Sequence, residues 1–381
     1  MPVYNGEATI GRALDSLLAQ DYPQDRYEII VVNDGSTDET FKVVAERPAV
    51  RYVELPRNMG IPSAQNAGLE AARGEIFAAF NDDCQAASDY LTEIAAAYLQ
   101  LDKPLGVGGL IVKQRSGKVT GVTANYIEAI GTVTNQGVGD AGPSFVPAVA
   151  RRFFSYLRSN YSAGQEDKLE DYPEVVELYG SNASFPIAKL RQIGGWDTSM
   201  AAPAVGGIED RDVCFRLRQR FPDHRYYNAR RANLMFDQDP RDSAASIKSY
   251  LLRPYRRGPF NYAFHVKNGL TPPLFPFPPL MLLILLADIA LAAQWPALIA
   301  FLPALVLLLP QLCYGWWVKR AVADRRPLCL LFPYFQAAEE TMVLVGLVKG
   351  SFTYRRMTSS PRPVGPPAQE KMAAVLPEGR R

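Results

Sequence analysis

The chain has 381 residues, of which 48% are hydrophobic, and a formal net charge of +2. A nearly balanced charge provides no overall field that would attract nucleic acid, so we expect no nucleic-acid partner. The four cysteines show no CxxC spacing and no disulfide framework, which fits a reduced, cytosol-facing compartment. With only two histidines, a multi-histidine metal site is excluded.

The chain opens on a loop-like segment, MPVYNGE, without the run of apolar residues that a first parallel strand needs. We therefore expect a truncated first strand, with the natural start upstream. Apolar residues at helical spacing predict an amphipathic helix over 8–19. The following run YEIIVV, residues 27–32, is typical of a parallel strand covered on both faces.

Strands and helices continue to alternate beyond this point. This rhythm predicts an α/β fold with a doubly wound parallel sheet. Residues 116–173 break the pattern and give no clear assignment. The predicted strands are 50–54, 76–80 and 107–113, and regular signals return at 179–185. The predicted helices are 38–46, 64–72, 90–101, 187–193 and 212–220.

An acidic turn, Asn81-Asp82-Asp83, directly follows the predicted strand 76–80. Open α/β sheets bind ligands at the carboxyl ends of their strands. Carboxylates at this position can bind a hard cation whose remaining ligands are diphosphate oxygens. The alternative is a plain strand-to-helix turn, in which Asp82 or Asp83 caps the next helix.

The composition becomes strongly apolar after about residue 274. Residues 274–293 carry a single charge and, at about 1.5 Å per residue, reach across a hydrocarbon core of about 30 Å. Residues 295–318 form a second run, so 274–318 predicts a transmembrane hairpin, and its basic flanks predict that both ends face the cytoplasm. The alternative is a pair of buried core helices. Residues 328–350 predict an amphipathic or membrane-associated helix, and 357–381 a disordered tail.

Five ordered motifs together resemble family 2 of the inverting glycosyltransferases. They are MPVYNGEATIGRALDSLLAQDYP, YEIIVVNDGSTDET, RNMGIPSAQNAGLEAARGEIFAAFNDDC, GSNASFPIAKLRQIGGWD and GIEDRDVCFRLR. The resemblance covers roughly residues 1–236. It implies a GT-A catalytic domain, assigned to residues 1–265, that uses a nucleotide-diphosphate sugar together with Mg²⁺ or Mn²⁺.

The resemblance also implies roles for individual residues. Asp34 would accept the N3–H of a uracil base, although it could instead cap the helix that follows. Asp83 would bind the metal ion, and Asp210 would be the catalytic base, with a charged helix start as its alternative. The other implied donor-binding residues are Pro2, Tyr4, Asn5, Glu7, Gln65, Asn81, Asp82 and Asn182, and the implied acceptor-binding residues are Gly195, Trp196 and Glu209.

Three positions depart from the family pattern. Asn81 stands where most relatives have aspartate, Gln65 where many have arginine, and Phe236 where many have a metal-binding histidine.

The apolar runs and the family resemblance together predict a multi-pass enzyme of the cytoplasmic membrane, with its catalytic domain facing the cytoplasm. It would contact membrane lipid and transfer a sugar from a nucleotide-diphosphate donor, expected to be a UDP-sugar, to a lipid-linked or polysaccharide acceptor. The alternative is a non-catalytic nucleotide-sugar-binding or assembly subunit of an envelope polysaccharide complex.

Overall fold

The computed structural model describes residues 1–115, 118–124, 171–200 except 173, 176 and 179, 208–237, 247–270, 277–313 and 332–359, and positions 272, 322 and 330. The unassigned stretch 125–170, the loop 201–207, the end of the second apolar run at 314–318 and the tail from 360 lie outside these residues. The chain divides into two compact units. The first comprises 1–130, 162–244 and 360–381, and the second 131–161 and 245–359.

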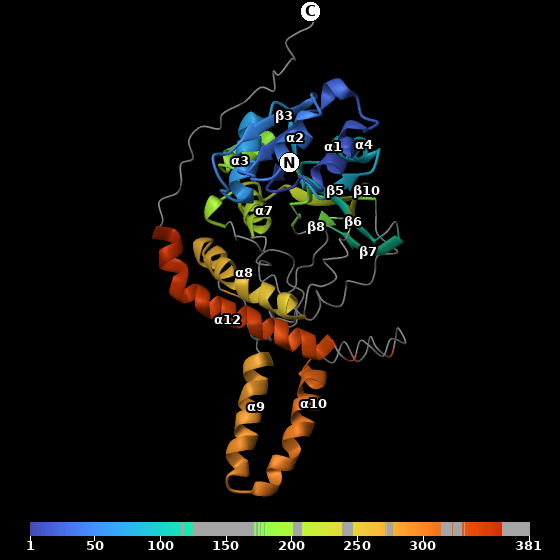
Figure 1. Cartoon of the computed structure of the whole chain (residues 1–381). Helices are drawn as coiled ribbons and strands as arrows, with labels where there is room; N and C mark the ends of the chain where they lie inside the picture. The colour runs from blue at the N-terminus through green and yellow to red at the C-terminus, as the bar shows by residue number, and fades with distance from the viewer. Residues whose placement is uncertain are drawn as a thin grey trace, which may run out of the picture. The chain divides into compact units, whose positions relative to one another are not determined.

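The N-terminal part of the first unit is a three-stranded parallel sheet in the order β1-β2-β3, formed by Pro2–Val3, Ile29–Asn33 and Val50–Glu54. The helices α1 (Ile10–Leu18), α2 (Thr40–Ala45) and α3 (Ile61–Ala71) alternate with these strands (Figure 1). Four of the five residues of β2 are buried. The continuous apolar run therefore forms the covered parallel strand that was predicted.

The rest of this unit contains a mixed sheet in the order β4-β9-β6-β10-β5. These strands are Ile76–Phe80, Asn182–Pro186, Pro104–Arg115, Arg225–Asp237 and Cys84–Ala86, with β7 (Lys118–Ala124) on β6 and β8 (Glu174–Val175) on β10. The β6–β10 pair is parallel, and the other pairs of this sheet are antiparallel. The parallel pairing expected throughout is thus limited to β1–β3 and β6–β10. The alternation of strands and helices along the sequence indicates the layers of the fold. It does not reveal that β9 lies between β4 and β6 and runs antiparallel to both.

Three further helices, α4 (Tyr90–Gln100), α6 (Ile187–Gln192) and α7 (Glu209–Arg220), accompany the mixed sheet. Helix α7 begins at Glu209, earlier than predicted, because the Asp212 N–H donates to the Ile208 carbonyl at 2.9 Å and closes an additional turn. Its acidic residues consequently lie in the first turn, where they complement the helix dipole.

The second unit is helical. Helix α8 (Ile247–Lys267) packs along α12 (Phe332–Ser359), and the backbones meet closely at Gly258 and Gly346, where neither position has room for a Cβ atom. Helix α8 thus lies with α12 in the second unit, which takes up the chain again at residue 245. The predicted extent of the catalytic domain, 1–265, stays a prediction.

The apolar helices of this unit are α9 (Phe277–Ala292) and α10 (Leu302–Cys313), the latter preceded by a 3-10 helix, Pro296–Phe301. Within the described residues, one helical segment, Pro296–Cys313, is long and apolar enough to cross a bilayer, and Pro278–Ala292 is apolar but shorter. One candidate span thus stands where two were expected. The alternative of buried core helices is not supported, because only 11% of the Pro296–Cys313 segment is buried.

Candidate active site

The acidic turn connects β4 to β5, so neither aspartate caps a helix; α4 begins only at Tyr90. Asp82 points towards the loop before α1, where its Oδ2 atom occupies the space of a side chain at Gly6 and accepts a hydrogen bond from the Thr9 hydroxyl at 3.4 Å. Asp83 is exposed. Burial, and then the neighbouring charge of Asp83, raise the pKa of Asp82 to about 6.

Asp82 and Asp83 supply carboxylate oxygens of the kind that Mg²⁺ and Mn²⁺ prefer. No group of three or more His, Cys, Asp or Glu side chains suited to a metal ion occurs in the described part of the chain. The residues therefore fit a cation held by one or two carboxylates and completed by substrate phosphate oxygens. Phe236 pairs with Cys84, the residue after Asp83, and its ring packs against the hydrophobic core that contains Cys84.

The loop after β1, which was predicted to bind the donor, is hydrogen-bonded to the loop after β2. The Asn5 N–H donates to the Ser36 hydroxyl, and the Asn5 side-chain oxygen accepts the Thr37 N–H, both at 2.8 Å. A Glu7 carboxylate oxygen accepts the Glu39 N–H at 2.9 Å, at the start of α2. Asn5 and Glu7 thus hold two loops together.

The remaining first-loop residues differ in exposure. Pro2 is paired with Val32 in the sheet, whereas Tyr4 is exposed. Tyr4 is therefore an aromatic side chain of this loop that is accessible from solvent.

Asp34 is 4% exposed and fixes the start of α3. Its two carboxylate oxygens accept the backbone N–H groups of Met59 and Gly60, at 2.7 and 2.8 Å. The alternative of a cap for the helix directly after β2 is not supported by these contacts. Burial raises the pKa of Asp34, although the two hydrogen bonds oppose the shift.

Two residues that were predicted to contact the sugar donor are buried inside the first unit. Gln65, on α3, is 4% exposed, and its Oε1 atom has no hydrogen-bond partner. Asn182 is fully buried; it accepts from the Tyr90 hydroxyl at 3.1 Å and donates to the carbonyls of Leu110 and Ala232. This arrangement does not support the predicted contact between Asn182 and a donor sugar, because its polar atoms join neighbouring strands.

Trp196 also differs from the expectation that it shapes an acceptor pocket. It is 3% exposed and packs against Phe77 and Phe185, with ring centroids 5.1 and 6.2 Å away. This burial could not be predicted from the sequence, because a tryptophan after two glycines suits a binding loop as well as a core. The preceding residue, Gly195, has a positive φ of 69°.

Asp210 lies in the first turn of α7, with its carboxylate against the backbone of Gly180. Gly180 comes two positions before Asn182, which pairs with Phe80 at the end of β4. The Asp210 carboxylate and the acidic turn therefore lie at the same edge of the mixed sheet. Glu209, in the same turn, is 5% exposed. Both readings of Asp210, a base and a favourable helix start, are compatible with this location.

Sequence reasoning overlooked Gly180, Asn66 and Arg216. All three lie inside the quoted motifs or directly beside them, and all three contact predicted site residues or their loops. A glycine or an asparagine in a motif has many structural uses, so only the spatial contact identifies the relevant one.

The fold of this chain is the GT-A type of glycosyltransferase fold. A mannosyltransferase from Pyrobaculum calidifontis, solved with GDP-Man and Mn²⁺, superposes with a TM-score of 0.51 at 20% identity, covering 92% of this chain and 85% of that one. At this identity the similarity establishes the fold.

The family follows from sequence. Residues 1–153 match glycosyl transferase family 2, so the chain contains a family 2 glycosyltransferase domain. The dodecaprenyl-phosphate galacturonate synthase of Rhizobium johnstonii is 32% identical over 158 residues, which cover 38% of this chain and 45% of that protein. The glucosyl-dolichyl phosphate glucuronosyltransferase of Haloferax volcanii is 24% identical over 225 residues, covering 58% and 62%. The aligned part thus spans less than two thirds of either relative.

Proposed function

We propose that this protein is an inverting glycosyltransferase that moves a sugar from a nucleotide-diphosphate donor, a UDP-sugar, to a lipid-linked or polysaccharide acceptor. The observation that carries the proposal is the Asp210 carboxylate, which lies against Gly180 at the sheet edge that also holds the acidic turn. The family 2 match supports the reaction class.

In the proposed reaction, Asp210 takes the proton of the acceptor hydroxyl as the hydroxyl oxygen attacks carbon one of the donor sugar. The bond from carbon one to the diphosphate oxygen breaks, and the nucleoside diphosphate leaves from the opposite face. The amino-terminal turn of α7 stabilises the negative charge of the base before the reaction. Glu209 and the backbone at Gly195 would orient the acceptor.

The donor would bind along the β1–α1 and β2–α2 loops. Tyr4 would pack on the nucleoside, and the Asp34 carboxylate, which retains lone pairs beyond its two backbone contacts, would accept the uracil N3–H. Asp83, with Asp82, would hold Mg²⁺ or Mn²⁺. When bound, such an ion neutralises charge on the departing diphosphate.

We further propose that the second unit attaches the protein to the cytoplasmic membrane, with the catalytic unit on the cytoplasmic side. The apolar segment Pro296–Cys313 supports attachment, as do exposed apolar side chains on α12, such as Val345, Val348 and Phe352. Basic residues before the apolar helices support the orientation. The names of the relatives, which refer to dodecaprenyl and dolichyl phosphates, support a lipid-linked acceptor.

The test is donor consumption by membranes carrying the full chain, with a panel of nucleotide sugars, Mn²⁺ or Mg²⁺, and extracted lipid acceptors. We expect transfer from a UDP-sugar, and a loss of about 100-fold or more in Asp210→Asn. Asp223→Asn, an exposed carboxylate beyond the same helix, is the matched control. Nucleotide binding without turnover would support the alternative of a non-catalytic subunit, which is favoured by Asn81, Gln65 and Phe236.

A further inference from the structure

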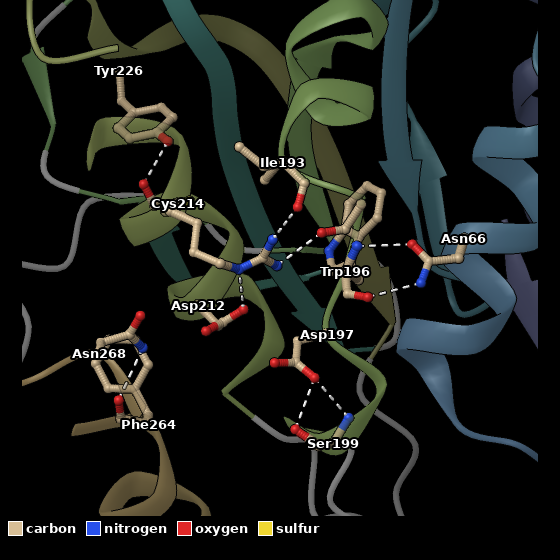
Figure 2. A network of polar contacts seen from close by, with 12 residues as sticks. Asn66, Ile193, Trp196, Asp197, Ser199, Asp212, Cys214, Tyr226, Phe264 and Asn268 are labelled. Atoms are coloured by element: carbon tan, nitrogen blue, oxygen red, sulfur yellow. Dashed lines mark hydrogen bonds and ion pairs between the residues drawn. The ribbon is translucent and has the colours of Figure 1, made fainter. Parts of the chain in front are cut away.

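Helices α3 and α7 are both bonded to the backbone of one loop, residues 193–197. From α3, the Asn66 side-chain oxygen accepts the Trp196 N–H, and the Asn66 amide donates to the Trp196 carbonyl, both at 2.8 Å (Figure 2). A side-chain amide that satisfies both backbone groups of one residue restrains that residue as a strand partner would. A side chain at Gly195 would collide with the Asn66 oxygen.

From α7, Arg216 holds the preceding part of the same loop. Its Nη1 and Nη2 atoms donate to the carbonyls of Ile193 and Gly195, at 2.9 and 2.8 Å, and its Nε atom donates to the Asp212 carboxylate at 2.7 Å. Asp212 is fully buried. The planar guanidinium thus meets three acceptors in fixed directions, which the single ammonium group of a lysine reproduces poorly.

These contacts connect the two ends of the candidate site. Asp34 fixes the start of α3 through Met59 and Gly60, and α7 carries Asp210 in its first turn. We propose that Asn66 and Arg216 are positioning residues, which align the Asp210 carboxylate with the donor bound near Asp34 by holding α7 to α3 through the loop 193–197. The inference rests on the proposed function.

The test compares Asn66→Asp and Arg216→Lys with wild type in the membrane assay described above. Asn66→Asp replaces the N–H donor of the Asn66 amide by an oxygen that faces the Trp196 carbonyl. Arg216→Lys keeps the positive charge but loses the planar set of guanidinium N–H groups. The matched control is Arg220→Lys, because Arg220 is exposed on the same helix. For each protein, kcat, donor KM, UDP binding and the thermal unfolding midpoint are measured, with activity assayed well below that midpoint.

We expect kcat to fall about 10–100-fold in both variants, as for a slightly misplaced catalytic group. Donor KM and UDP affinity should stay within about twofold of wild type, since the contacts do not involve the donor site directly. A purely structural role would instead lower the folded fraction and UDP binding together with activity, and would overturn the inference. A variant with a kcat close to that of wild type would also overturn the inference. A wild type that turns over no donor would overturn the proposed function, and this inference with it.

Discussion

The Asp210 carboxylate occupies the space in which any residue other than glycine at position 180 would carry its side chain. An ideal Cβ atom on Gly180 would lie 2.8 Å from Cγ and 2.9 Å from Oδ2 of Asp210. The backbone at Gly180, just before β9, thus limits the position of Asp210, the proposed catalytic base.

Gly180→Ala should therefore displace the Asp210 carboxylate. We expect kcat to fall about 10–100-fold, because a shift of about 1 Å at a reacting group has such an effect. Gly194→Ala is a useful control for the loss of a glycine in itself, since a Cβ atom there meets nothing within 4 Å, although its positive φ adds strain. A Gly180→Ala protein that keeps its stability and full kcat would contradict the assignment of Asp210 as base.

Removing carboxylates from the acidic turn should separate the roles of its two aspartates. Asp83→Asn should raise the Mn²⁺ concentration needed for half-maximal activity by about tenfold or more, and EDTA should abolish activity. Asp82→Asn should have a smaller effect, because Asp82 points towards Gly6 and Thr9. The titration of activity with Mn²⁺ measures both, and the reverse order would assign the metal to Asp82.

Recognition of the base by Asp34 predicts a characteristic pH dependence. The carboxylate accepts the uracil N3–H only when it is ionised, and burial raises its pKa above the ordinary value. Affinity for uridine should therefore be full at neutral pH and should fall, as the pH is lowered, earlier than for an exposed aspartate. Uridine is the appropriate ligand because it has no phosphate that titrates in this range. Asp34→Asn should bind weakly with a flat profile, and an unchanged profile would exclude the contact.

Asn182 should matter for stability and not for the donor. Asn182→Ala leaves the Tyr90 hydroxyl and two strand carbonyls without their partner, so the free energy of unfolding should fall by about 1–3 kcal/mol. Tyr90→Phe removes one of these hydrogen bonds and should have a smaller effect, near 1 kcal/mol. Chemical denaturation measures both. If Asn182→Ala instead raised donor KM in a protein of unchanged stability, the sequence-based assignment would be restored.

Local patterns in the sequence determined the helices and strands and indicated the class of reaction. The run at β2, the helix of α1 and the strand β4 follow from apolar periodicity, which depends on nearby residues alone. The ordered motifs pointed to a family 2 domain, and the match over residues 1–153 confirms it for the part of the chain that contains Asp34 and Asp83. The role of Asp210 stays a prediction.

Only the tertiary structure decided which of these side chains are accessible and which are used internally. Asn182 and Trp196 lie in polar motifs, yet they are buried because β9 pairs between β4 and β6 and the loop 193–197 folds onto the core. Gly180 and Asn66 acquire their roles through contacts with residues 30 and 130 positions away in the chain. Pairing and burial of this kind arise from long-range packing, and no periodicity within a short stretch of sequence contains that information.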